Sequence, residues 1–129
     1  MVHSTIIDEN EEHLVDWRTD VRRRFPDWST DEALKRWPTV KKQLHIGQGI
    51  SGEVIARAPF GVWLDIGVTF PALLLVPNME GAKVRRIAFD DYPSKGTFLD
   101  GRINALGDAG EIGVTQNNPD RMIEGEGTT

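Results

Sequence analysis

From Leu44 onward, glycines arrive every few residues, and short runs of β-branched and aromatic residues stand between them. This texture is typical of short strands joined by tight turns. Strands are predicted over residues 48–57, 61–66, 72–76, 97–105 and 111–115. The stretch 79–93 is too long for a hairpin, so we expect a loop with a helical turn there. Five short strands with one longer connection favour a small, partly open, antiparallel β-barrel.

The chain before the barrel is expected to be helical. Over residues 8–25, four apolar side chains recur at intervals of three and four and so share one helical stripe; they are Leu14, Trp17, Val21 and Phe25. Pro26 should stop this helix. The basic run 22–24 suits the negative end of the helix dipole, although it is also a candidate contact for phosphates or for a partner protein.

A second, shorter helix is signalled by Ser29 and Glu32, which have the spacing of a capping box. Leu34 and Trp37 are expected to form its buried face. Pro38 should end it, because the residue before a proline is pushed out of the helical region. We expect the helical segment, residues 1–43, to pack on the barrel through Leu14, Trp17, Val21 and Trp37.

Composition limits the classes of function. The 129 residues suit a single core, and without cysteine there is no disulfide, thiolate metal site or cysteine nucleophile. The net charge is −5, and acidic residues outnumber basic ones in residues 1–43 (nine to eight), 44–116 (eight to six) and 117–129 (three to one). This balance argues against a protein that grips duplex nucleic acid through its phosphates.

No apolar run is long enough to cross a bilayer, and the N-terminus lacks the pattern of a secretory signal. We therefore expect a cytoplasmic protein without a membrane partner. The polar segment 117–129 is expected to be a flexible tail. His3, His13 and His45 are too dispersed for a metal site, and no catalytic motif occurs, so neither a cofactor nor enzymatic activity is expected.

Residues 44–116 resemble the S-one RNA-binding motif, the repeat unit of ribosomal protein S-one. The resemblance rests on the order and spacing of Gly47, Gly52, the run FGVWLDIG at 60–67 and the pair Lys95-Gly96. It implies an oligonucleotide/oligosaccharide-binding (OB) fold. It also implies that RNA lies on the face of strands two and three, held by two aromatic residues, a histidine and basic residues.

Phe60 and Trp63 occupy the two aromatic positions, whereas Leu75 stands at the histidine position. Arg57, Lys95 and Arg102 are the candidate basic contacts. The plainer alternatives are that the aromatic side chains pack within the fold and that the basic side chains are scattered, solvated charges. Leu75 is expected to face the barrel interior or a dry surface.

Two functions therefore stay open. The first is weak, non-sequence-specific binding of single-stranded RNA or DNA around Phe60 and Trp63. The second is a protein-interaction module on a barrel that has lost RNA binding. A positive groove beside an exposed Phe60 or Trp63 would favour the first function.

Overall fold

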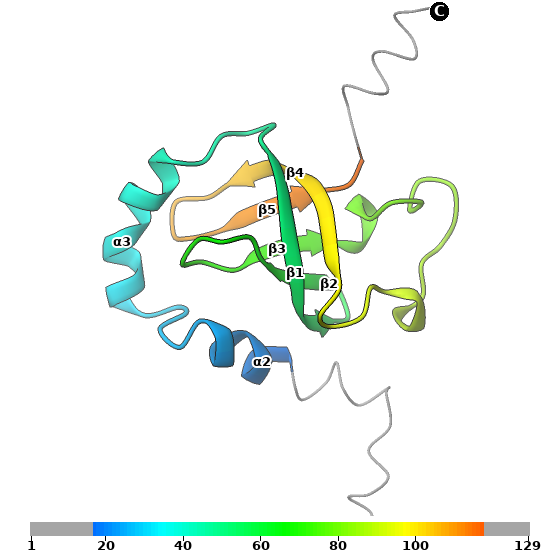
Figure 1. Ribbon diagram of the computed structural model, residues 1–129, viewed down its shortest axis with the longest axis horizontal. Coiled ribbons are helices and arrows are strands. Elements are labelled where there is room, and N and C mark those ends of the chain that lie inside the picture. Colours follow the sequence, from blue (N-terminus) through cyan, green and yellow to red (C-terminus); the bar gives the residue numbers. More distant parts are fainter. Residues whose placement is uncertain (1–16, 118–129) are drawn as a thin grey trace, which may run out of the picture.

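Two short helices precede five strands in the computed structural model, which describes residues 17–117 (Figure 1). The elements are α2 (Trp17–Arg24), α3 (Asp31–Lys42), β1 (Gly49–Ala58), β2 (Gly61–Asp65), β3 (Ala72–Leu75), β4 (Phe98–Leu106) and β5 (Ile112–Thr115), with short 3-10 turns η2 (Val76–Asn78) and η3 (Phe89–Asp91). All five predicted strands are present within about one residue of their expected ends, and the long connection contains a helical turn. The expected contact of Leu14 and the predicted tail beyond Asn117 lie outside the described residues.

The strands form a closed barrel in the order β1-β2-β3-β5-β4, and β4 pairs with β1 to complete the ring. Four of the pairings are antiparallel, but β3 and β5 run parallel, with Leu73 opposite Gly113. The predicted five-stranded OB-fold barrel with N-terminal helices is confirmed, but the ring is closed rather than partly open and one of its pairs is parallel rather than antiparallel. Direction cannot alternate around a closed ring of five strands, so one pair must be parallel. This strand order is that of an OB fold.

The barrel interior is filled by the side chains on the inward-facing side of each strand. Its most deeply buried side chains are aliphatic and come from every strand: Val54, Val62, Leu64, Leu74, Ile103 and Val114. Because neighbouring residues of a strand point to opposite faces, the burial of Val62, Leu64 and Leu74 turns Trp63, Leu73 and Leu75 outward. Leu75 is thus on the outer wall, 39% exposed, rather than in the barrel interior.

Two different segments close the ends of the barrel (Figure 1). At one end, the Trp37 indole N–H of α3 donates a hydrogen bond to the Gly107 carbonyl at 3.0 Å, and its ring centroid lies 5.0 Å from that of Phe70. At the other end, the connection between β3 and β4 contributes buried Met79, Ile87 and Tyr92 to the same core. Helix α3 and the barrel therefore share one hydrophobic core.

Helix α3 differs from its prediction at both ends. Thr30 rather than Ser29 is the N-cap, and its hydroxyl accepts a hydrogen bond from the Ala33 amide. Ser29 has a positive φ of 69°, which is incompatible with the extended backbone of an N-cap. The helix also continues through Pro38, because packing on the barrel core holds it on both sides: Trp37 is buried before the proline, and Val40 packs against the same core after it.

The buried face of α3 consists of Ala33 and Trp37, whereas Leu34 is 44% exposed. The expectation that Leu34 is buried is therefore wrong. A helix that contacts its neighbour through one narrow stripe leaves the residue beside that stripe on the boundary with solvent.

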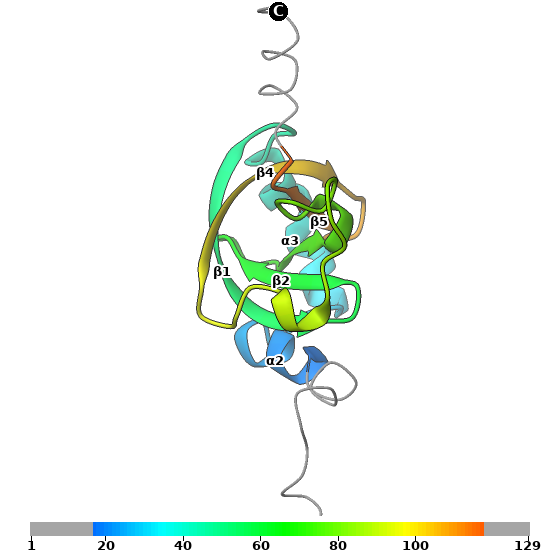
Figure 2. The same cartoon turned by 90° about the vertical axis from the view of Figure 1, so that its right-hand side faces the viewer.

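Helix α2 packs against the outer wall of β1 and β2 (Figure 2). Trp17, Val21 and Phe25 are buried there, as the helical stripe predicts, against the β1 residues Ile55, Ala56 and Ala58. Consecutive Ile55 and Ala56 both belong to this cluster because the pairing of β1 with β2 shifts register between Val54 and Ala56, which breaks the strict alternation of faces.

Ion pairs add to this attachment. The carboxylate of Asp20, buried in α2, lies 2.9 Å from Lys95 Nζ before β4; within the helix it also lies 3.1 Å from Arg23 Nη1. Arg24 contacts Asp65 at 2.6 Å and Glu53 at 3.2 Å, and these two hydrogen bonds raise the pKa of its guanidinium. Helix α2 is therefore held to the barrel by both apolar and charged contacts. Within residues 17–117, no helix is long and apolar enough to cross a membrane.

The single tyrosine of the chain provides a spectroscopic test of the covered barrel end. The Tyr92 hydroxyl donates a hydrogen bond to the Pro59 carbonyl at 2.7 Å, and burial raises the pKa of this phenol above its usual value. Folding therefore favours the neutral phenol. Its contribution to the free energy of unfolding is complete below the ordinary tyrosine pKa, and it is lost as the pH rises through the higher pKa of the folded protein. An alkaline absorbance titration is expected to show a midpoint above that of free tyrosine; a midpoint at or below it would contradict this packing.

Candidate functional site

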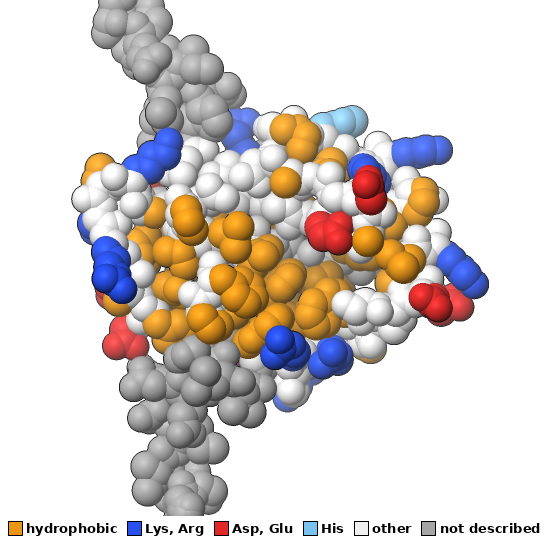
Figure 3. All heavy atoms as spheres, turned by 180° about the vertical axis from the view of Figure 1, so that it is seen from behind, with side chains coloured by type: hydrophobic (Ala, Val, Ile, Leu, Met, Phe, Trp, Pro, Cys, Tyr) orange, Lys and Arg blue, Asp and Glu red, His pale blue; other side chains and the backbone are white. Residues whose placement is uncertain are grey.

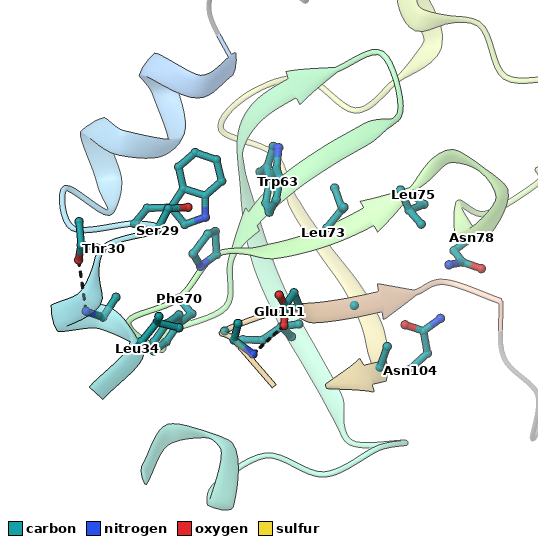
Figure 4. A pocket seen from close by; sticks show the side chains of 18 residues that line it. Ser29, Thr30, Leu34, Trp63, Phe70, Leu73, Leu75, Asn78, Asn104 and Glu111 are labelled. Atoms are coloured by element: carbon teal, nitrogen blue, oxygen red, sulfur yellow. Dashed lines mark hydrogen bonds between the residues drawn. The ribbon is translucent and has the colours of Figure 1, made fainter. Parts of the chain in front are cut away.

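The outer wall of β2, β3 and β5 carries an apolar groove, with the start of α3 at one end (Figure 3 and Figure 4). Its volume is about 430 Å³, which lies in the range of ligand-binding pockets. Trp63, Leu73 and Leu75 line it from β2 and β3, and Leu34 lines it from α3. Asn78 and Asn104 lie toward the far end, beyond Leu75 (Figure 4). This is the wall of an OB fold on which oligonucleotides and oligosaccharides bind.

The electrostatic character of the groove is nearly neutral. Glu111 is the one charged side chain among its described lining residues, and one of its carboxylate oxygens accepts a hydrogen bond from the Ala109 amide at 2.9 Å. No lysine or arginine of the described chain lines the groove. The floor of the groove therefore provides no positive charge that would compensate a phosphate.

Four aromatic rings gather beside the groove. Trp17 stacks nearly parallel on Trp63, with 5.8 Å between ring centroids and 12° between planes. Trp28 contacts both tryptophans edge-on, and so does Phe60 from the turn between β1 and β2. We call these four residues the aromatic cluster. Trp17 of α2 thus covers part of Trp63, one of the two aromatic residues that the sequence predicts to stack on bases.

Two arginines of α2 lie on this cluster. The guanidinium carbon of Arg18 is 4.4 Å from the ring centroid of Trp17, and that of Arg22 is 5.4 Å from the ring centroid of Trp28. Both arginines are exposed. Sequence reasoning considered the basic run 22–24 and the tryptophans separately, and it did not consider Arg18. The signal that it missed is the spacing of these arginines. Arg18 and Arg22 directly follow Trp17 and Val21 of the apolar stripe, so both lie on the helix face next to that stripe.

The five candidate binding residues do not form one site. Phe60 and Trp63 come together, with 6.3 Å between ring centroids, and Phe60 is 38% exposed. Arg57 lies over the Phe89 ring, with its guanidinium carbon 4.3 Å from the centroid, and donates a hydrogen bond to the Phe89 carbonyl. The two other cations are elsewhere, Lys95 on Asp20 and Arg102 on the Gly47 carbonyl.

The connection between the two helices, next to the groove, is fixed by charge. Arg36 donates a hydrogen bond to Asp27 at 2.6 Å, which lowers the pKa of that carboxyl group and raises the pKa of the guanidinium. This pair links the residues after α2 to the middle of α3. Within residues 17–117, no group of three or more histidine, cysteine, aspartate or glutamate side chains is placed to hold a metal ion.

Comparisons with known proteins give distant structural likenesses. No protein-family model matches the sequence, and no curated protein is significantly similar to it. Among the solved structures, GSP13 from Bacillus subtilis is 15% identical with a TM-score of 0.47, over 56% of this chain and 55% of that one. The intact alpha subunit of aIF2 from Pyrococcus abyssi is 15% identical with a TM-score of 0.46, over 64% of this chain and 34% of that one.

A third likeness, RNase R from Mycoplasma genitalium in its apo form, is 14% identical with a TM-score of 0.45, over 64% of this chain and 15% of the enzyme. The matched region thus spans about half of GSP13 and smaller parts of the other two proteins. Because these identities and scores are low, function has to be inferred from the residues of this chain.

Proposed function

We propose that this chain is a non-catalytic module of S-one type that binds single-stranded nucleic acid at the exposed edge of the aromatic cluster. The observation that carries the proposal is that Phe60, partly open to solvent, packs edge-on against Trp17, whose other neighbours include the exposed Arg18. An aromatic ring beside an arginine is the combination that single-stranded nucleic-acid binding uses, because the ring stacks on a base while the cation meets the backbone.

The arginines of α2 supply the positive charge that the groove on the barrel strands lacks. Among residues 17–117 no cation lines the groove, and Lys95 and Arg102 already contact other parts of the chain. Arg18 and Arg22 lie on the aromatic cluster with their guanidinium groups in solvent, where they can meet phosphates without losing a buried partner. Two cations release few counterions, so binding is expected to be weak, to depend only shallowly on salt and to show little sequence preference.

The residue at the family's histidine position also favours weak binding. The histidine position holds Leu75, which lines the apolar groove and offers no hydrogen bond to a base or phosphate. Stacking on Phe60 is then expected to contribute most of the affinity, since one base-aromatic stack contributes about 1–3 kcal/mol.

A titration with labelled oligouridine and oligothymidine at two salt concentrations tests the proposal. Phe60→Ala is expected to weaken binding by about tenfold or more, because it removes the exposed ring. Arg18→Gln is expected to weaken binding several-fold and to reduce the salt dependence, since one phosphate contact is lost. Arg102→Gln is the matched control, because Arg102 contacts the Gly47 carbonyl away from the cluster, and it should bind as the parent chain does.

Melting curves must accompany these variants, so that a change in affinity is separated from unfolding. No measurable affinity for either oligonucleotide would reject the proposal in favour of a barrel that recognises another protein. Binding that survives Phe60→Ala in a folded chain would place the nucleic-acid site away from the aromatic cluster.

A further inference from the structure

The groove on β2, β3 and β5 shares Trp28 and Trp63 with the aromatic cluster, but three leucines also line it. Two of its large apolar side chains are well exposed, Leu34 at 44% and Leu75 at 39%. They come from α3 and β3, and Leu73 lies between them on the groove wall (Figure 4). Figure 3 shows apolar side chains gathered continuously over this face. Covering such a surface with apolar atoms is favourable, because it removes apolar area from water.

At one end of the groove the polar lining residues are two neutral amides, Asn78 and Asn104; Ser29 and Thr30 lie at the α3 end. The Asn104 side chain lies across Gly113, where a Cβ atom would come within 2.8 Å of its Oδ1 atom. Asn78 lines the same end of the groove, beyond Leu75 (Figure 4). Among the described residues, no hydrogen bond occupies either side-chain amide. An asparagine amide offers a donor and an acceptor together, which complements the N–H and C=O of a peptide backbone.

Glu111, the one charged side chain among the described lining residues, disfavours nucleic acid in the groove. Glu111 lies nearer the α3 end than the asparagines do (Figure 4), and it is exposed. A phosphodiester in the groove would face this carboxylate with no lining cation to compensate its charge. A lysine or arginine at the same point would instead gain a charged partner. The lining therefore favours an apolar segment that carries a basic residue.

We propose that the groove is a docking site for a short segment of another protein, with apolar side chains against Leu34, Leu73 and Leu75 and a lysine or arginine that meets Glu111. The segment's backbone pairs with Asn78 and Asn104. The groove shares Trp28 and Trp63 with the aromatic cluster, but its lining does not include Phe60 or Arg18, which carry the proposed nucleic-acid binding.

The test begins with selection of short random peptides from a display library on the immobilised full chain. The expected consensus contains apolar residues and one lysine or arginine. The best peptide is synthesised with a fluorescent label, and its affinity is measured by anisotropy for the parent chain and its variants. Leu75→Asp is expected to weaken binding at least tenfold, because it places a charge on the apolar wall. Val84→Asp is the matched control, since Val84 is 86% exposed on the β3–β4 connection outside the groove, and it should bind normally.

Glu111→Lys provides a second arm that does not rely on the stability of β3, because Glu111 is an exposed residue of the β4–β5 turn. This variant is expected to lose affinity for the basic peptide and to regain it when the peptide's lysine or arginine is replaced by glutamate. Such an exchange of preference is not produced by general destabilisation.

Three results would overturn the proposal. The first is that the selected peptides bind Leu75→Asp, confirmed as folded by its melting curve, as tightly as the parent chain. The second is that oligouridine displaces the peptide and is itself weakened by Leu75→Asp, which would make the groove part of the nucleic-acid site. The third is that the parent chain is a dimer by light scattering and Leu75→Asp is a monomer, which would make the groove an interface between copies.

Discussion

Gly61→Ala is expected to unfold the barrel or to lower its free energy of unfolding by more than about 3 kcal/mol, at the upper end of what single substitutions do. Gly61 opens β2 directly opposite Leu75 of β3. A Cβ atom at this position would collide with the Leu74 carbonyl oxygen and would come within 2.9 Å of Leu75 Cα. Both obstacles are backbone atoms, so no side-chain rotation relieves the collision, and β2 and β3 would have to separate.

Gly49→Ala is the matched control, because a Cβ atom there meets nothing within 4 Å and Gly49 also lies at the start of a strand. Chemical denaturation of both variants measures the difference. A Gly61→Ala chain as stable as the parent would mean that the β2–β3 pairing in this structure is wrong. That result would also undermine the groove, whose wall is built from these two strands.

Trp63→Ala is expected to lower the free energy of unfolding by about 2–4 kcal/mol, somewhat less than the about 3–5 kcal/mol of fully buried aromatic residues, because Trp63 is only partly buried. The ring contacts Trp17, Trp28 and Phe60. Its removal leaves a cavity between α2 and the strand wall and takes away one side of the groove. The measurement is thermal and denaturant unfolding, with tryptophan fluorescence of the remaining rings as a local report.

Trp63→Phe tests the aromatic packing at this position separately from the polar indole N–H. The Trp63 indole N–H is buried and has no hydrogen-bond partner among residues 17–117. Phenylalanine retains an aromatic ring and removes this unsatisfied donor, so its cost is expected to be much smaller than that of alanine. If alanine and phenylalanine destabilise equally, the stacked cluster is not what holds α2 to the barrel.

The contrast between Trp63 and Phe60 refines the interpretation of the two aromatic positions. Both match stacking positions of the S-one pattern, but they differ in surroundings. Trp63 is under the parallel ring of Trp17, whereas Phe60 keeps 38% of its surface open. We therefore expect substitution at Trp63 to act mainly on stability and substitution at Phe60 to act mainly on binding.

The strands could be predicted because their signals are local. Glycine spacing and alternation of apolar side chains depend on residues within one turn or one strand, and the five strand positions follow from them. The burial of Trp17, Val21 and Trp37 could be predicted for the same reason, since helical periodicity marks the stripe that must be covered. The apolar character of residues 72–76 likewise indicated that both faces of β3 needed apolar surroundings.

Other features were decided only by contacts between distant segments. Helix α3 continues past Pro38 because Trp37 and Val40, on either side of the proline, pack on the barrel core, and Trp37 is hydrogen-bonded to Gly107, 70 positions later in the chain. The parallel β3–β5 pair results from closing a ring with an odd number of strands. Neither effect has a signature in any short stretch of sequence.

The candidate sites divide in the same way. The sequence by itself determined which residues are chemically able to bind: two aromatic side chains on the S-one pattern, a set of scattered cations and a leucine in place of a histidine. Only the tertiary structure decided which of them are available, because Lys95 meets Asp20 across 75 positions and Trp17 covers Trp63. It also assembled the groove from Leu34, Leu75 and Glu111, which lie on three separate elements. A side chain's type is a property of the sequence, whereas its neighbours and its exposure are properties of the folded chain.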